Sequence, residues 1–280
     1  MTDMILSYLM SEKELWLAPP EIEEIENLEE KWFYHDPLYN LCIQLSYLNS
    51  SNEESYGAVA IQTVGDVPTI IGLGWNMYMG GETNLKRQGY ANHAEFQAAA
   101  VAEGIGYNLN DRKKQTCIYV AGRFVKEDML FFSPENISFT CITCTTTLPK
   151  YFRNTSLAAP TVSKGWRHMD MQEAYFSSLF FNHNELKRRD VLQTHAKASK
   201  LNIAPNQNSV KNLVEKIKYF GFKIDSNIQN RLLGKYENLL TKKTSERRKI
   251  IEEMVDRKYK TLRGGKQASI VVFDNSIDKT

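Results

Sequence analysis

The apolar and polar positions near the start of the chain predict a helix followed by a β-hairpin. In residues 36–48 an Asp-Pro start precedes apolar residues at i, i+3, i+4 and i+7, which is the spacing of one buried helical face. Residues 56–64 and 69–75 are rich in β-branched and aromatic residues, and the intervening Gly65-Asp-Val-Pro68 has the composition of a turn. We therefore expect two paired strands after this helix.

The alternation of helical and strand patterns continues to about residue 184. The further elements expected are a helix over 92–103, a strand over 115–122, a helix from near Thr140 to Pro149, a strand over 156–162 and a helix over 170–182. Residues 124–139 are predicted to be a long connection in which Met129–Phe132 is exposed. This order predicts an α/β fold, an α-β-α sandwich with a mixed sheet of about five strands flanked by helices.

Composition and charge divide the chain into three expected parts. Residues 1–35 are predicted to be an N-terminal arm, residues 36–184 a folded domain and residues 185–280 an extension. The net charge of the 280 residues is +2, but Lys and Arg outnumber Asp and Glu two to one in the extension, whereas the rest of the chain is acidic. We expect the extension to be basic, mostly helical and without strands before its last dozen residues.

The sequence also excludes several classes of protein. No apolar run approaches the roughly 20 residues that cross a bilayer, and the apolar patch 4–10 has no basic residues before it, unlike a secretory signal. Four cysteines in 280 residues are too few for a disulfide scaffold. We expect a soluble, cytoplasmic protein with free thiols and no membrane association.

Two short segments carry the chemistry. His93-Ala94-Glu95 and Cys141-Ile142-Thr143-Cys144 each open a predicted helix. One imidazole and two thiolates are the Cys₂His ligand set of a catalytic zinc site, which keeps a fourth position for water. Helix N-termini favour the thiolate form of cysteine. Glu95 is close enough in sequence to His93 to move a proton of that water without being a ligand.

These segments match the H-x-E and C-x-x-C signature of the zinc nucleobase deaminases. The chain over about 36–184 resembles the cytidine and deoxycytidylate deaminase superfamily, and the hairpin motifs Gly57-Ala58-Val59 and Gly74-Trp75-Asn76 resemble those of the family. The resemblance implies a cytidine-deaminase-like fold, a Zn²⁺ cofactor and hydrolytic deamination of a cytosine nucleotide or nucleoside. It further implies that Glu95 is catalytic, that Asn76 and Ala94 contact the substrate, and that the protein is a homo-oligomer.

Several alternatives stay open at this point. The two cysteines could form a redox pair or half of a structural zinc site, and Asn76 could only cap the hairpin. Thr140 stands where the family has proline. The remaining cysteines and histidines lack ligand spacing, and we expect Cys42 and Cys117 to be small core residues. A non-catalytic protein that retains a zinc-stabilised fold is a further alternative, although structure alone does not require Glu95.

The substrate is less well defined than the metal ligands. A small-molecule nucleotide would need a cationic contact to its phosphate, and Trp166 could either stack on a base or belong to the core or an interface. The nearest cations in the sequence are Lys86, Arg87, Arg123, Lys164 and Arg167. The runner-up substrate is a base in single-stranded DNA or RNA, bound through the basic extension. Apolar residues at helical spacing within that extension instead favour docking on the acidic domain or on a second subunit.

Overall fold

The computed structural model describes seven stretches of the chain. These are residues 32–48, 54–78, 91–133, 141–162, 165–183, 193–197 and 214–229. Most of the predicted arm and of the predicted extension lies outside the described residues. No helix among these stretches is long and apolar enough to cross a bilayer.

The described strands form a mixed sheet of eight strands, which confirms the α/β class. Five of them make its central part: β1 (Glu54–Val64), β2 (Val67–Trp75), β5 (Thr116–Phe124), β7 (Thr155–Thr161) and β8 (Gly165–Met169). Three short strands extend it: β6 (Met129–Phe132), β9 (Gln193–Lys197) and β10 (Lys223–Ile224). The two-residue strands β3 (Met77–Tyr78) and β4 (Ala91–Asn92) pair separately.

The order of the central sheet is β10-β2-β1-β5-β7-β8. Strands β2, β1 and β5 are antiparallel neighbours, β7 runs parallel to β5, and β8 is antiparallel to β7. The C-terminal end of β5 pairs with β6, and β6 pairs in turn with β9.

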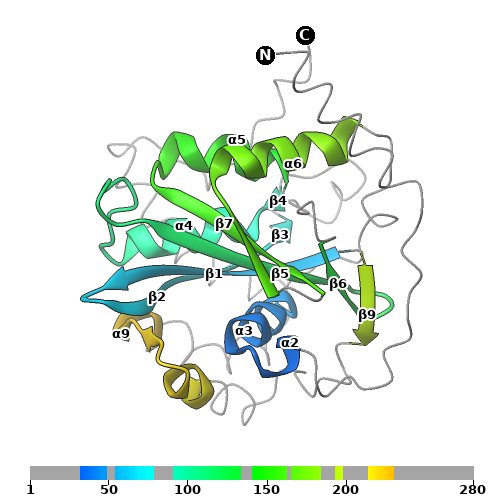
Figure 1. Ribbon diagram of the computed structural model, residues 1–280, viewed down its shortest axis with the longest axis horizontal. Coiled ribbons are helices and arrows are strands. Elements are labelled where there is room, and N and C mark those ends of the chain that lie inside the picture. Colours follow the sequence, from blue (N-terminus) through cyan, green and yellow to red (C-terminus); the bar gives the residue numbers. More distant parts are fainter. Residues whose placement is uncertain are drawn as a thin grey trace.

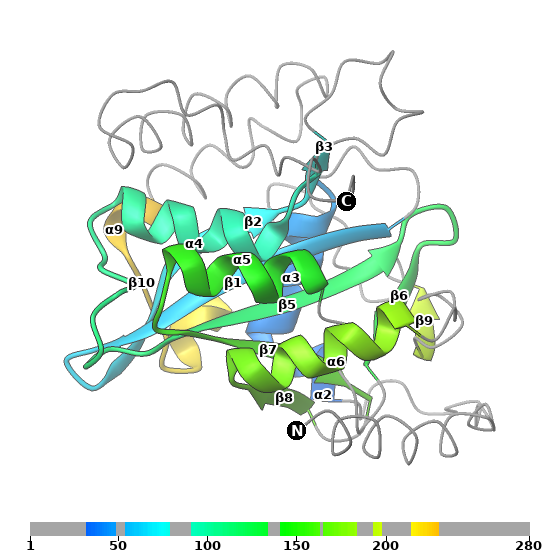
Figure 2. The same ribbon diagram turned by 90° about the horizontal axis from the view of Figure 1, so that it is seen from above.

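Helices cover both faces of this sheet, as Figure 1 shows. One face carries α4 (Ala94–Gly104), α5 (Ile142–Tyr151) and α6 (Met171–His183), which lie side by side in Figure 2. The other face carries α2 (Trp32–His35) and α3 (Pro37–Ser46), with a helix over 214–219 and α9 (Ser226–Ile228) beyond them. The domain is therefore a three-layer α-β-α sandwich.

Glycines on adjacent strands let a helix approach each face closely. A Cβ at Gly57 of β1 would collide with the Cys42 carbonyl of α3, and a Cβ at Gly74 of β2 would collide with the Ala94 carbonyl of α4. Because side chains alternate along a strand, paired residues share a face. On β5, Tyr119 pairs with Val59, which lies two residues after Gly57 on β1. Tyr119 therefore faces α3, as Gly57 does.

The expected helix starts are confirmed, and their chemistry explains them. Asp36 caps α3, because its Oδ1 accepts a hydrogen bond from Tyr39 N at 2.7 Å, and Pro37 begins the helix. The alanine-rich α4 packs on the sheet through buried alanines, as expected for a helix that lies close to strands. α5 continues two residues beyond Pro149, where the helix was expected to end; the proline loses its own i→i−4 hydrogen bond, but Phe152 N still donates to Leu148 O at 2.7 Å.

Two sequence predictions about the strands are wrong, and one strand was missed. The segment Met129–Phe132 was expected to be exposed in a connection, but it forms β6, and Leu130, Phe131 and Phe132 are fully buried. Strand β8 was not predicted, because its residues show no regular alternation. The extension was expected to lack strands, but β9 and β10 both join the sheet through long-range pairing.

Candidate metal centre

Two helix starts on the same face of the sheet bring the predicted metal ligands together. His93 is the N-cap of α4 and Cys141 is the N-cap of α5, both with extended backbone angles. Neither side chain caps its own helix, and each is half-buried. Cys144 lies one turn into α5 and is fully buried.

The ligand atoms of these three residues converge. The imidazole nitrogen and the two sulfurs lie within 4.8 Å of one another, and among the described residues they are the only group of histidine, cysteine and acidic side chains that could hold a metal ion. Cysteine sulfur binds zinc at about 2.3 Å and histidine nitrogen at about 2.0–2.1 Å, so three donors at this separation can share one ion. The donor set fits a transition metal with affinity for sulfur and nitrogen, such as Zn²⁺.

Glu95 belongs to the same cluster. Its side chain is 7% exposed and lies within hydrogen-bonding reach of the Cys144 thiol. Burial raises the pKa of that thiol, and the neighbouring Cys141 sulfur and the Glu95 carboxylate raise it further. Two sulfurs and a carboxylate at one buried place repel one another as anions, and a divalent cation removes that repulsion. The electrostatics of the cluster therefore favour a bound metal.

The strand end next to the metal centre is held by buried hydrogen bonds. Gln97, one turn after His93, accepts a hydrogen bond from Trp75 N through Oε1 at 2.7 Å, and its side chain is 1% exposed. Sequence reasoning missed Gln97, although an amide in an alanine-rich helix was a visible signal. Ala94 is fully buried where α4 meets β2.

The predicted substrate residue Asn76 has a structural partner. Its Oδ1 accepts a hydrogen bond from Tyr56 N at 2.7 Å, while Asn76 N donates to Tyr56 O at 3.2 Å. These bonds fix the end of the hairpin, as the capping alternative predicted. The side chain is half-buried, and its predicted contact with a sugar stays a prediction.

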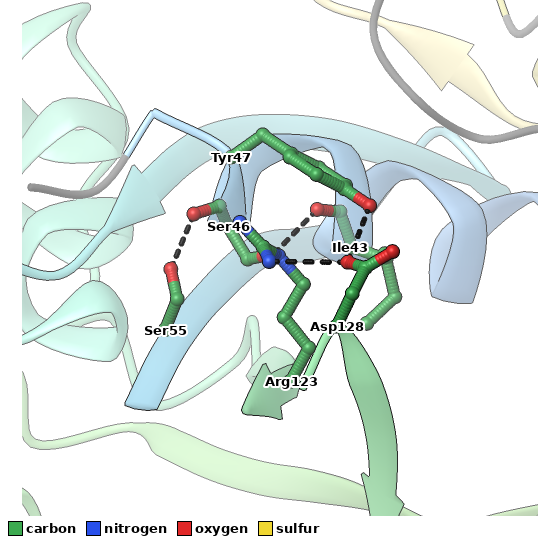
Figure 3. Close-up of polar contacts among 6 residues, drawn as sticks. All are labelled: Ile43, Ser46, Tyr47, Ser55, Arg123 and Asp128. Atoms are coloured by element: carbon green, nitrogen blue, oxygen red, sulfur yellow. Dashed lines mark hydrogen bonds and ion pairs between the residues drawn. The ribbon is translucent and has the colours of Figure 1, made fainter. Parts of the chain in front are cut away.

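Arg123 and Arg167 have acidic partners in the structure. Figure 3 shows Arg123 Nη1 bonded to Asp128 Oδ1 at 3.2 Å, with the Tyr47 hydroxyl on the same oxygen. The guanidinium lies 3.8 Å from the centre of the Tyr47 ring, on the α3 face of the sheet. Arg167 pairs with Glu173 at 2.6 Å. Lys86, Arg87 and Lys164 lie outside the described residues.

Trp166 is half-buried and packs against the core, in agreement with the second of its predicted roles. Its ring contacts those of Trp32 and Tyr119 at centroid distances of 5.8 and 5.0 Å, and its Nε1 donates to Asp36 Oδ2 at 3.1 Å. Cys42 is fully buried, as expected. Cys117 is only half-buried, which differs from the core role that we predicted for it.

Cys117 lies in an open cleft on the α3 face. Its Sγ is 3.5 Å from His168 Nδ1, and the cavity volume is about 780 Å³. Burial raises the pKa of the Cys117 thiol to about 11 and lowers the pKa of His168. Both groups are therefore uncharged near neutral pH, and the cleft does not hold a reactive thiolate.

Comparison with known proteins adds no assignment, since no family model, no curated protein and no solved structure matches the chain. The cluster of possible metal ligands and the two sequence motifs therefore remain the basis for any function.

Proposed function

We propose that the protein is a zinc-dependent hydrolase that deaminates the cytosine ring of a nucleotide or nucleoside and releases ammonia. The observation that carries this proposal is the convergence of His93, Cys141 and Cys144 beside a buried carboxylate, Glu95. A structural metal site has no need of that carboxylate. The resemblance of the two sequence motifs to nucleobase deaminases supplies the reaction class.

His93, Cys141 and Cys144 would hold the metal. A bound Zn²⁺ would supply the Lewis acidity that makes water a nucleophile near neutral pH. Because the three side chains come from two helix starts, the N–H groups of the first turns also point towards the cluster and stabilise negative charge there. A protein ligand set of three leaves the position that a catalytic site needs for water.

Glu95 would move the protons of the reaction. Water adds to the ring carbon that carries the amino group, and ammonia leaves, so that the amino group is replaced by a carbonyl. The carboxylate takes a proton from the water and delivers it to the departing nitrogen. Its place against the thiol of Cys144 puts it within reach of the groups that would bind the metal.

A second candidate substrate is a base in single-stranded DNA or RNA. The observation that favours it is the excess of Lys and Arg in residues 185–280, two described segments of which join the sheet as β9 and β10. Because these segments are part of the folded domain, basic residues of the extension are anchored close to the sheet.

The test is a substrate panel on the purified full-length chain, with bound metal assayed in the same samples. We expect ammonia release from free deoxycytidylate or cytidine, and loss of that release in Glu95→Gln protein that still contains zinc. Turnover of an oligonucleotide with no turnover of the free compounds would favour the second candidate. Zinc-loaded protein that releases no ammonia from any member of the panel would contradict both.

A further inference from the structure

The two most exposed aromatic side chains in the described part of the chain are neighbours. Tyr219 is 87% exposed and Phe220 is 52% exposed, and their ring centroids are 5.8 Å apart with the planes at 81°. Tyr219 is the last residue of the helix over 214–219, Phe220 follows it, and Gly221 then adopts a φ of 84° and turns the chain. We call Tyr219 and Phe220 the aromatic platform.

The aromatic platform is anchored in the core. Ile217 in the same helix and Ile228 in α9 are fully buried, and Phe222 packs against the core. The Tyr107 hydroxyl donates to Asp225 Oδ2 at 2.9 Å. The other apolar residues of the segment are therefore buried or packed against the core, and the exposure of the platform does not come from a lack of packing.

Three lysines lie within three residues of the aromatic platform along the chain. Lys218 pairs with Glu215 at 3.3 Å, whereas Lys216 and Lys223 have no ion pair among the described residues. A surface hollow is lined by Lys216, Lys218, Glu215 and Tyr219. The phenol ring therefore borders a concave surface that carries unpaired positive charge.

We propose that the aromatic platform binds single-stranded nucleic acid by stacking bases on Tyr219 and Phe220, with Lys216 and Lys223 contacting phosphates. Proteins that bind single strands combine aromatic rings with a positively charged surface, because every base has a stacking face and every nucleotide has a phosphate. An apolar protein segment would need a continuous apolar surface to bind to. The lysines near the two rings instead favour a ligand that carries negative charge.

The platform and the metal centre are well separated. Lys223 pairs with Thr69 at the start of β2, whereas Gly74, near the other end of that strand, abuts the first turn of α4. At about 3.3 Å per strand residue, these places lie roughly 15–20 Å apart along the strand. The helix over 214–219 also lies on the α3 side of the sheet in Figure 1. Binding at the platform therefore needs no metal and no deaminase activity.

The test measures fluorescence anisotropy of a labelled oligothymidylate of about 20 nucleotides, which is longer than the site of a small domain. The proteins are the full chain, a Tyr219→Leu/Phe220→Leu variant, which keeps apolar area without a π face, and a Tyr219→Phe/Phe220→Tyr variant. We expect the leucine variant to bind at least about 10-fold more weakly and the aromatic exchange to bind within about twofold. Lys216→Ala/Lys223→Ala should reduce the salt dependence of binding.

Two results would overturn the proposal. Equal affinity of the leucine variant and the unchanged chain would show that stacking is absent, and equal affinity of all variants would place binding elsewhere. Thermal melting of each variant checks that it is folded, which the exposure of both rings favours. The binding assay has no deaminase readout, so failure of the deaminase proposal would leave this result intact.

Discussion

The two faces of the sheet differ in how their polar and charged groups are compensated. On the α3 face, aromatic rings contact one another, and the Arg123 charge is paired with Asp128 and stacked on Tyr47. On the α4 face, two sulfurs and a carboxylate gather at one buried place. The first arrangement stabilises the fold by itself. The second costs free energy unless a cation joins it, and that difference indicates where a metal ion could bind.

The largest effect should come from replacing a buried cysteine of the α4 face by serine, compared with the same replacement on the α3 face. Cys144 and Cys42 are both fully buried on helices. Cys144→Ser should abolish zinc binding, because the remaining two ligands hold zinc poorly, and should lower the melting temperature. The measurement is metal content and calorimetry after dialysis.

Cys42→Ser is the matched control. Its thiol donates to the Tyr119 carbonyl on the α3 face, a bond that a hydroxyl can also make. We expect this variant to keep its zinc. Loss of metal in both variants, or in neither, would remove the distinction between the two faces.

The next effect concerns chemistry without metal loss. Glu95→Gln keeps the shape of the side chain but cannot accept a proton, so ammonia release should fall by about 10²–10⁴-fold. Zinc content should stay the same, since Glu95 is not among the three converging ligands. Steady-state rates and metal analysis on the same preparation check this, and an undiminished rate would exclude Glu95 as the proton carrier.

A smaller effect is expected from removing the side-chain amide of Gln97, which accepts the hydrogen bond between β2 and α4. Gln97→Leu leaves the Trp75 N–H buried without its acceptor, which costs about 1–3 kcal/mol of unfolding free energy. The variant should also bind zinc more weakly, because the first turn of α4 carries His93. Denaturant unfolding and zinc titration measure the two effects.

Gln62→Leu is the control for this prediction. Gln62 is buried and donates to Thr116 Oγ1 at 3.1 Å, away from the helix starts. It should lose stability without losing zinc affinity. If both glutamine variants bound zinc like the unchanged chain, Gln97 would have no part in positioning the metal ligands.

The smallest effect is a pH dependence on the α3 face. Burial raises the pKa of the Asp36 carboxyl above 3.8, although hydrogen bonds from Tyr39 and Trp166 oppose the shift. The folded state then binds a proton more tightly than the unfolded state, so the unfolding free energy falls as pH rises from about 3.8 through the raised value. Asp36→Asn keeps the cap and should lack this slope, a difference within about 1 kcal/mol. Melting temperatures of both proteins are measured from pH 3 to 7. The same pH dependence in the unchanged chain and in Asp36→Asn would contradict this prediction.

The part of the fold that depends on local signals was predictable from the sequence. The capped start at Asp36-Pro37 and the hairpin turn are encoded within a few residues, and so are the two helix starts that carry the metal ligands. The convergence of His93, Cys141 and Cys144 was predictable because metal chemistry restricts a ligand set to few residue types.

The rest depends on contacts between distant parts of the chain. The segment Met129–Phe132 is apolar throughout and shows no alternation with polar residues. It becomes a buried strand because it pairs with β5, where Phe131 lies opposite Gly122. Lys223–Ile224 forms a strand because β2 offers an open edge, which no local pattern reveals. The bond from Trp75 N to Gln97 likewise requires the strand end and the helix to meet.

The most direct test of the central claim is zinc K-edge X-ray absorption of the purified full-length chain. The account predicts a four-coordinate zinc with two sulfurs at about 2.3 Å and two nitrogen or oxygen donors at about 2.0–2.1 Å, because two cysteines and one histidine leave one position for water. In Cys144→Ser protein this spectrum should disappear. A shell of four sulfurs, or a protein that purifies and refolds with no affinity for zinc, would contradict it.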